Sequence, residues 1–464
     1  MKESTGSSAI FGTGQEEVVS TDLRKNSLGV LGVTVAALGF NAPAWIAATT
    51  IPLMYAVSGT TTPLTILFTF FFPMLVLCFC FVALVRRYPS AGGVFTFTQK
   101  LIHPQAGSLV GWVYTVACTM IVPLTAVTGS QYLQVLFPAL ANIDVKWIAA
   151  VVVLIYAAIG IRGVRWTIFT GTVFLIIESS VVVGTGLLGI FNPHHSGVSF
   201  LGMYNPANAP SPWLGVLSGV LLGIWLLANF DSAIQLIEEA RRPVLTVQKA
   251  LLLTLTLELV IYSIAAIGWQ YAVGWEAAAN PPAKYQGVAL SYIADQYLAY
   301  PFSLIAVIVV ITSSFANLQM SLQAAARISY RMAKEGHLPT VFAKVHPDWK
   351  SPWVATVLIL GAAWVMIAIV GSNLLFYINS VGLLWVVSYC SAAIAFIILM
   401  RRSPYAIPYA LLPIASVVVM LYAGWSAGPG ALTLGAIWIT IGIALMGYSL
   451  WRRTRPSGVA PAIP

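Results

Sequence analysis

Charged residues are scarce in this chain. Aspartate, glutamate, lysine and arginine make up 8% of its 464 residues, whereas 59% are hydrophobic. Soluble domains are about a quarter charged, so this composition excludes a soluble protein and indicates one embedded in a membrane. The formal net charge is +9. We attribute it to lysines and arginines in loops at the membrane surface and expect no nucleic acid partner.

Cysteine and histidine are scarce as well. The four cysteines all lie inside apolar segments: Cys78, Cys80, Cys118 and Cys390. They form neither a disulfide framework nor a metal-binding spacing, and we interpret them as small buried side chains. His194 and His195 are adjacent in a polar loop with no third ligand near, so a solvated pair is favoured over a metal site. Because a nucleophile motif and a phosphate-binding loop are missing too, we expect no enzyme, no metal and no cofactor.

The start of the chain lacks the features of a secretory signal, which are a basic stretch followed by an apolar core. Residues 1–24 are instead rich in serine, threonine, glycine and glutamate. We expect them to form a flexible cytoplasmic tail, and we expect a second cytoplasmic tail at 453–464.

Long apolar runs dominate the rest of the sequence. A helix that crosses a bilayer needs about 20 predominantly apolar residues. On this criterion the sequence predicts an all-α membrane protein with twelve transmembrane helices. They lie at about 28–55, 61–85, 105–137, 145–161, 167–191, 212–237, 248–274, 301–330, 352–371, 374–400, 405–425 and 430–451.

The basic residues predict the orientation of these spans. If twelve spans alternate in direction, only Lys146 and Lys284 fall on one side of the membrane, and the other loop lysines and arginines fall on the opposite side. Cytoplasmic loops carry an excess of basic residues. We therefore expect both termini in the cytoplasm and a multi-pass protein of the plasma (inner) membrane.

Two of the predicted spans are interrupted near their middle. The first contains Gly39, Asn41 and Pro43, and the sixth contains Asn229 and Asp231. Proline removes a backbone donor, and a carboxylate inside a membrane is costly and is by default a functional-site hypothesis. Opened backbone is tolerated in a membrane only where protein or a water-filled cavity satisfies it. The interruptions therefore predict two broken helices that line a site.

The positions of the two breaks predict an internal repeat. Secondary transporters form their binding sites from broken helices in matching positions of two inverted repeats, and spans one and six match if each repeat has five spans. We therefore predict a first repeat over 25–191 and a second over 212–400, followed by spans eleven and twelve over 405–452.

Three further stretches occur in order along the chain. They are RRYPSAGGVFTFTQKLIHPQAGSLVGW from Arg86 to Trp112, FDSAIQLIEEARRPVLTVQKA from Phe230 to Ala250, and ARISYRMAKEGHLPTVFAKVHPDWKSP from Ala326 to Pro352. Together they resemble the amino acid–polyamine–organocation superfamily of permeases. The resemblance implies a leucine-transporter-like fold, alternating access and small-molecule substrates, usually amino acids or amines.

The chain departs from this resemblance at the first break. Amino acid permeases of the superfamily usually carry a glycine-rich run there, whose bare amides take the substrate carboxylate. Here the run is Phe40 to Trp45, and Pro43 has no N–H to offer. The pattern, together with Phe230-Asp231, is closer to branches that include polyamine and other amine porters. An α-amino acid and an amine both remain open as substrates.

We expect the substrate site at the two breaks. Its candidate residues are Asn41, Ala42, Pro43 and Trp45 from the first span and Trp225, Asn229, Phe230 and Asp231 from the sixth. The indole faces could hold an ammonium group by cation–π attraction, or they could simply pack. Asp231 could bind an amine, or it could be a structural carboxylate held by backbone donors.

Glu178 is the only charged residue in the fifth span. The resemblance places it where some proton-coupled relatives carry a lysine in place of a sodium ion. A carboxyl group buried there could load and release a proton, or it could be structural. Ser313 and Ser314 in span eight, next to Thr312, fall where sodium-coupled relatives place hydroxyl ligands, but such hydroxyls usually bond to their own helix. We therefore favour proton coupling over sodium.

Two other acidic residues have open roles. Glu258 in span seven could be a second amine-binding carboxylate or a packing residue. Glu238, at the cytoplasmic end of span six, could join an inner gate with Arg327, or it could belong to a solvated cluster of charges.

These observations predict a secondary active permease for an amino acid or related amine, proton-coupled or working by exchange. The alternative is a polyamine or diamine importer, which would need more than one carboxylate for a dication. Beyond the substrate and the bilayer we expect no partner, and the protein could be a monomer or a homodimer.

Overall fold

The computed structural model describes five segments of the chain: 28–162, 168–195, 211–285, 288–348 and 351–454. The predicted tail at 1–24 lies outside them, as does most of the predicted tail at 453–464. Within the described segments the regular structure is helical apart from an isolated parallel β-bridge between Leu28 and Ala240. The prediction of an all-α protein is confirmed there.

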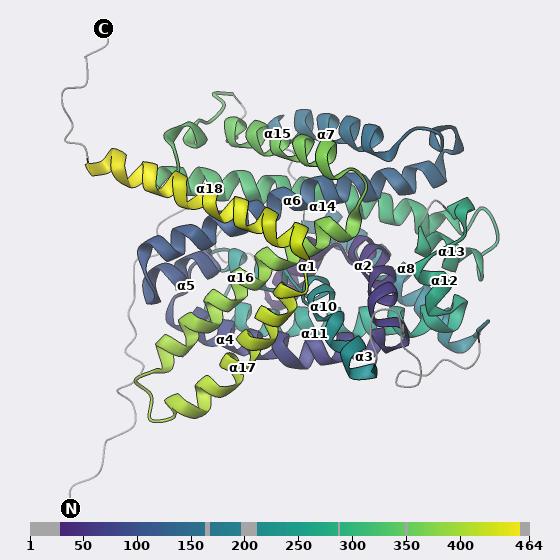
Figure 1. The fold of residues 1–464 in the computed structure, drawn as a ribbon, viewed down its shortest axis with the longest axis horizontal. Helices are drawn as coiled ribbons and strands as arrows, with labels where there is room; N and C mark the ends of the chain where they lie inside the picture. The colour runs from purple at the N-terminus through teal and green to yellow at the C-terminus, as the bar shows by residue number, and fades with distance from the viewer. Residues whose placement is uncertain (1–27, 163–167, 196–210, 286–287, 349–350, 455–464) are drawn as a thin grey trace, which may run out of the picture.

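The first half of the described chain runs from α1 to α8 (Figure 1). Its α-helices are α1 (Val30–Asn41), α2 (Pro43–Ser58), α3 (Thr62–Thr69), α4 (Leu75–Arg87), α5 (Gly93–Leu101), α6 (Pro104–Leu136), α7 (Val145–Arg162) and α8 (Ile168–Phe191). A π-helical segment, Phe70–Met74, connects α3 to α4, and short 3₁₀ turns lie at Gly59–Thr61 and Pro138–Leu140.

The second half contains the remaining helices. They are α9 (Pro212–Ser218), α10 (Val220–Leu226), the 3₁₀ helix η4 (Phe230–Leu236), α11 (Pro243–Val273), α12 (Trp275–Ala279), α13 (Ala289–Asp295), α14 (Leu304–Lys334), α15 (Trp353–Val370), α16 (Leu374–Met400), α17 (Ala406–Trp425) and α18 (Pro429–Thr454). Short 3₁₀ turns lie at Ala283–Tyr285 and Thr340–Ala343.

Nine helical stretches in the described residues are long and apolar enough to cross a membrane, and ten are if the bent pair Pro212–Ser218 and Val220–Leu236 counts as one. One of the nine, Pro43–Arg87, is 45 residues long and covers the part of the first predicted span that follows the break and the whole of the second predicted span. Val30–Asn41 and Val145–Tyr156 are apolar but shorter. The multi-pass architecture is confirmed, whereas the count of twelve spans and the inverted repeat stay predictions.

The bundle is built around α6 and α14, which pack along each other at its centre (Figure 1). The most apolar part of α6 is completely buried, whereas only 22% of the corresponding part of α17 and of α18 is buried. Exposed apolar helices are stable in lipid because their backbone groups are bonded internally. We therefore place α17 and α18 at the rim of the bundle, facing lipid.

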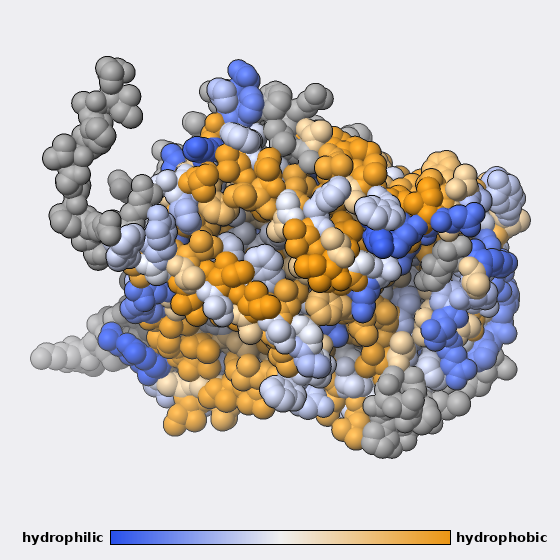
Figure 2. All heavy atoms as spheres, turned by 45° about the horizontal axis from the view of Figure 1, so that its top comes forward, coloured by the Kyte–Doolittle hydropathy of each residue, from blue (hydrophilic) through white to orange (hydrophobic). Residues whose placement is uncertain are grey.

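The surface separates into an apolar middle and two polar ends. Figure 2 shows hydrophobic side chains gathered over the middle of one face and hydrophilic ones toward its left and right ends. In Figure 1, α5 lies at the left end, and α12 and α13 lie at the right end. A bilayer would surround the middle and leave these short helices in the two aqueous phases.

The first predicted span is broken where the sequence indicates. α1 ends at Asn41 and α2 begins at Pro43, and Ala42 between them has a left-handed backbone with φ 55°. Proline is favoured at the first position of a helix because the N–H that it lacks would have no partner there. Pro43 therefore marks the start of a second helix and not a kink in one continuous helix.

The sixth predicted span is broken as well. α10 ends at Leu226, a turn follows, and Asn229 adopts a left-handed backbone with φ 71° before η4 begins. Asparagine tolerates this conformation better than most residues. A second bend, of 46°, separates α9 from the rest of this span at Gly219.

Leu28, two residues before α1, is bonded to the end of the sixth span. The N–H of Leu28 donates to the backbone oxygen of Glu239 (3.0 Å), and the N–H of Arg241 donates to the oxygen of Leu28 (2.9 Å). These two bonds form the β-bridge. They fix the start of α1 against the chain that follows η4.

Candidate functional site

The first helix break is bonded to its neighbours through Asn41, the last residue of α1. Its Nδ2 donates to the backbone oxygen of Ala228 at the second break (2.8 Å) and to Oε1 of Glu258 on α11 (2.8 Å). Its Oδ1 accepts a hydrogen bond from the hydroxyl of Tyr262 on α11 (2.8 Å). One buried amide thus joins α1, the second break and α11. Its predicted contact with a substrate stays a prediction.

Replacing Asn41 should therefore destabilise the protein. Asn41→Ala leaves three buried polar groups without their partner, and we expect the free energy of unfolding to fall by about 3 kcal/mol. Tyr262→Phe is the matched control because it removes one of the same three bonds, and its cost should be about a third as large. The melting temperatures of the purified variants in detergent test this. An Asn41→Ala variant as stable as the wild type would contradict it.

Glu178 on α8 lies at the N-terminal end of α2 and is only 6% exposed. Its Oε2 accepts a hydrogen bond from Oγ of Ser313 on α14 (2.8 Å). Ser313 Oγ in turn accepts from the N–H of Trp45 (3.2 Å). The first N–H groups of a helix have no partner within it, and the helix dipole favours a carboxylate there. Glu178 and Ser313 therefore cap α2 at the break.

α14 contacts both sides of the first break. Besides the contact of Ser313 with α2, Nδ2 of Asn317 donates to the backbone oxygen of Phe40 near the end of α1 (2.7 Å). The hydroxyls of Ser314 and Thr312 donate instead to carbonyl oxygens of α14 itself. The predicted pair Ser313 and Ser314 is thus split, with Ser313 at the break and Ser314 bonded within its helix.

Asp231 lies at the start of η4 and is 4% exposed. Its Oδ1 accepts a hydrogen bond from the hydroxyl of Tyr389 on α16 (2.9 Å). The same Tyr389 oxygen accepts from the N–H of Asn229 (3.2 Å). Tyr389 thus contacts two residues at the start of η4, on one side of the second break.

Aromatic side chains surround the two breaks. The indoles of Trp45 and Trp225 meet edge to face, with ring centroids 6.0 Å apart and an interplanar angle of 88°. Both are buried, and among the described residues neither Nε1 has a hydrogen-bond partner. Phe230 packs against Tyr389, with centroids 6.1 Å apart. The predicted aromatic residues are therefore brought together, but they pack on each other and expose no indole face in this conformation.

A cavity of about 260 Å³ leads away from Asp231 toward the end of α14. Its walls come from the start of α5, from α6, from η4 and from α14. Gln235, one turn beyond Asp231, lines it and donates to the hydroxyl of Tyr114 (2.9 Å). Arg327 and Arg331 line the other end. The cavity therefore connects the buried carboxylate of Asp231 to a mouth lined by the basic residues Arg327 and Arg331.

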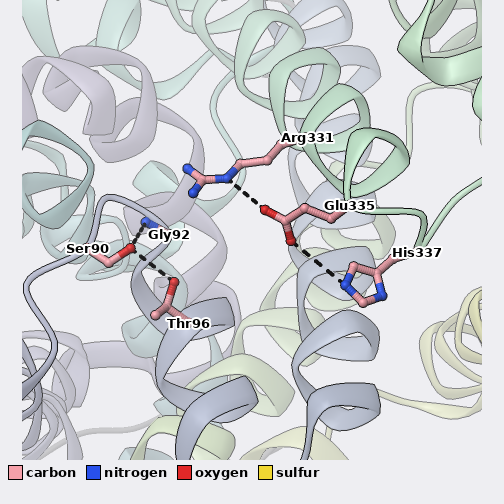
Figure 3. A network of polar contacts seen from close by, with 6 residues as sticks. All are labelled: Ser90, Gly92, Thr96, Arg331, Glu335 and His337. Carbon is pink, nitrogen blue, oxygen red and sulfur yellow. Dashed lines mark hydrogen bonds and ion pairs between the residues drawn. The ribbon is translucent and has the colours of Figure 1, made fainter. Parts of the chain in front are cut away.

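The mouth of this cavity is held by polar contacts, shown in Figure 3. Nε of Arg331 donates to Oε1 of Glu335 (3.2 Å), and Oε2 of Glu335 lies 3.8 Å from Nε2 of His337. The other ring nitrogen of His337 is 2.8 Å from Oγ of Ser108 on α6. Across the cavity, Oγ of Ser90 accepts from the N–H of Gly92 at the start of α5. The contact between His337 and Ser108 connects the chain just after α14 to α6, whereas the bond between Gly92 and Ser90 lies within the turn before α5.

Of the two predicted gate residues, Arg327 lies at this mouth. Arg327 lines the cavity, and its Nη2 lies 3.5 Å from Oε1 of Gln323 on its own helix. Glu238 follows η4 at the end of the sixth span. Their pairing stays a prediction.

The sequence analysis did not select three residues that the structure places at the breaks: Tyr262, Asn317 and Tyr389. Tyr389 cannot be told from a packing or interfacial aromatic by sequence alone. Spacing could have found the other two contacts. Asn317 lies four residues after Ser313, and Tyr262 lies four residues after Glu258, so each pair shares a helix face.

Comparisons with known proteins agree with this geometry. Among curated proteins, the chain is 23% identical over 287 residues to the low-affinity putrescine importer PlaP of Escherichia coli. That alignment covers 60% of this chain and 60% of the importer, less than two thirds of its length. The methylthioribose transporter of Bacillus subtilis is 23% identical over 405 residues, covering 81% of this chain and 82% of that transporter.

A human relative gives a similar match. Asc-type amino acid transporter 1 is 23% identical over 397 residues, covering 82% of this chain and 74% of that protein. A model of the family described as amino acid permease matches residues 31–448, almost the whole described chain. Such relatives carry small molecules through a membrane. The chain therefore belongs to the amino acid permease family, within the superfamily that its sequence resembles, and the family and these relatives point to a transporter and not to an enzyme.

Proposed function

We propose that this permease moves an amino acid or related amine across the plasma membrane by alternating access, and that it is driven by protons. The observation that carries the proposal is a buried carboxylate at each helix break, Asp231 at the second and Glu178 at the first. Unpaired charges are costly inside a membrane. Two buried carboxylates at the helix breaks therefore suit a site in which one carboxylate binds a cation and the other binds a proton.

Asp231 is the proposed partner of the substrate ammonium group. It lines the inner end of the cavity, so a small molecule can reach it from that side. Its hydrogen bond from Tyr389 leaves acceptor positions on the carboxylate. The indole of Trp225 on the neighbouring α10 could hold the same cation by its face once the two tryptophans part.

Glu178 is the proposed proton carrier. As a carboxylate it accepts a hydrogen bond from Ser313, whose hydroxyl in turn accepts one from the N–H of Trp45, and its negative charge stabilises the N-terminal end of α2. Protonation removes this charge and weakens the cap. The cap joins α2 to α8 and α14. Protonation of Glu178 would therefore weaken the contacts between these helices at the first break and shift the equilibrium between the conformations of the transport cycle.

A diamine is the second candidate substrate, and one observation favours it. Oε2 of Glu258 is completely buried and has no hydrogen-bond partner among the described residues, while Oε1 is held by Asn41. A buried acceptor left unpaired is unusual. It could take the second ammonium group of a diamine whose first lies at Asp231. Similarity to a putrescine importer points the same way.

The membrane sidedness is also a proposal. The mouth lined by Arg327 and Arg331 belongs to the face where the sequence places most basic loops, so we assign it and both termini to the cytoplasm. The described conformation then faces inward. A monomer or a homodimer fits equally with this arrangement.

Uptake into proteoliposomes tests the proposed function. We expect labelled putrescine or another cationic amine to accumulate when the lumen is more alkaline than the outside, and a protonophore to abolish this accumulation. A sodium gradient at equal pH should drive none. Accumulation that follows sodium would overturn proton coupling. Failure of every amine and amino acid to enter under either gradient would overturn the transport assignment.

A further inference from the structure

The cavity that leads away from Asp231 carries charges of opposite sign at its two ends. Its charged lining residues are Asp231 at the inner end and Arg327, Arg331 and Glu335 toward the mouth. Arg331 and Glu335 form an ion pair with each other (3.2 Å), so their charges largely cancel. Arg327 contacts only the uncharged Gln323, and within the described part of the chain neither Arg327 nor Asp231 belongs to an ion pair. One negative and one positive charge are therefore left uncompensated.

The inner end also holds acceptors that lack donors. Asp231 accepts a hydrogen bond from the hydroxyl of Tyr389, which carries no charge. Oδ1 of Asn229 and Oγ of Ser232, close to Asp231 along the chain, are buried and have no hydrogen-bond partner among the residues that the structure describes. An ammonium group brings one positive charge and three donors. It is therefore the group that this end of the cavity suits best.

Between the two ends the walls are largely apolar. Gln235 and Tyr114, the polar residues there, are bonded to each other (2.9 Å) and need no ligand. The apolar walls come from α5, α6 and α14, with Phe95, Val110, Gly111, Ile328 and Met332 among them. A Cβ at position 111 would lie 3.1 Å from the ring of Phe95 and 3.3 Å from the sulfur of Met332, so these two side chains pack over the glycine. A hydrocarbon chain suits this middle section.

We propose that the cavity binds a linear ω-amino acid, with its ammonium group at Asp231, its methylene chain along the apolar walls and its carboxylate at Arg327. This inference rests on the proposed function and specifies its substrate class. A guanidinium group matches a carboxylate with two parallel hydrogen bonds. An α-amino acid carries both charges on one carbon and can compensate only one end. An amine without a carboxylate leaves Arg327 uncompensated, and a diamine that points to the mouth brings a like charge to it.

Replacing Arg327 separates its charge from its size. Arg327→Gln removes the charge and the paired donors, whereas Arg327→Lys keeps the charge and loses the paired geometry. Arg402→Gln is the matched control, because Arg402 is an exposed arginine just after α16 and does not line the cavity.

The measurement is equilibrium binding to the purified full chain in detergent, at one fixed ionic strength. The probes are 4-aminobutyrate, 5-aminopentanoate and 6-aminohexanoate, each paired with its 2-amino isomer, which has the same atoms and the same net charge. Hexylamine supplies the chain and the cation without a carboxylate. We expect the wild type to bind at least one ω-amino acid about tenfold more tightly than its isomer and than hexylamine, a ratio that a hydrogen bond between charged groups can supply.

The variants assign this preference to Arg327. It should disappear in Arg327→Gln, persist in part in Arg327→Lys and stay unchanged in Arg402→Gln. Binding of hexylamine to Arg327→Gln with wild-type affinity shows that this variant is folded and that its Asp231 end is intact. Equal affinities of every ω-amino acid and its isomer for the wild type, or a preference that survives in Arg327→Gln, would overturn the inference.

The same panel distinguishes this inference from the proposed function. If hexylamine or the 2-amino isomers bind and the ω-amino acids bind no more tightly, the substrate class is wrong and the proposed transport of an amino acid or amine still stands. If no compound of the panel binds the wild type, the ω-amino acid site is refuted, and uptake of other amines into proteoliposomes then decides the proposed function separately.

Discussion

Asp231→Asn should lower amine uptake at least about 100-fold and abolish the thermal stabilisation of the purified protein by amines. The substitution keeps the size of the side chain and leaves an oxygen that can accept from Tyr389. It removes only the charge. Losing one partner of a buried ion pair costs about 3–5 kcal/mol, and a factor of 100 corresponds to about 2.7 kcal/mol.

Tyr389→Phe is the control for this expectation. It deletes the hydrogen bonds to Asp231 and Asn229 and leaves the carboxylate in place, so uptake should fall by about tenfold or less. Both variants should be compared by initial rate and by equilibrium binding of the same amine. Wild-type affinity in Asp231→Asn would show that the ammonium group binds elsewhere.

Glu178→Gln should uncouple transport from the proton gradient. Glutamine can still accept a hydrogen bond from Ser313, so the cap on α2 is kept, but it cannot take up or release a proton at physiological pH. We expect accumulation driven by a pH gradient to fall at least about tenfold, to the level reached without a gradient. Exchange of labelled for unlabelled amine should continue, because exchange needs no net proton movement.

The comparison between net uptake and exchange is the decisive readout for Glu178. A variant that is merely misfolded loses both activities, whereas an uncoupled one loses only the first. If Glu178→Gln still accumulates amine against its gradient, the coupling proton belongs to another carboxyl group, and Glu258 is then the next residue to replace.

Sequence alone indicated the class of the protein and the positions of both breaks, for reasons that are local. Apolar runs identify membrane helices without reference to their neighbours. Pro43 and the Asn229–Asp231 stretch disturb a helix wherever they occur. The structure refines this picture only slightly, by placing the left-handed residue of the first break at Ala42.

The partners of the candidate residues could not be obtained in this way. Tyr389 is 158 positions from Asp231, and Glu258 is 217 positions from Asn41. Which face of one helix meets which face of another depends on packing that leaves no periodic signal in a uniformly apolar span. For the same reason the sequence treated Ser313 and Ser314 alike, although a rotation of about 100° around α14 separates them.

The β-bridge at Leu28 has a mechanical consequence. α1 is fastened to the sixth span at both of its ends, by Leu28 to Glu239 and Arg241 and by Asn41 to Ala228. α1 is therefore bonded to the chain on both sides of Asn229, the left-handed residue of the second break: to Ala228 before it and to Glu239 and Arg241 after it. A change of the backbone angle at Asn229 would have to break one of these contacts or carry α1 along with it.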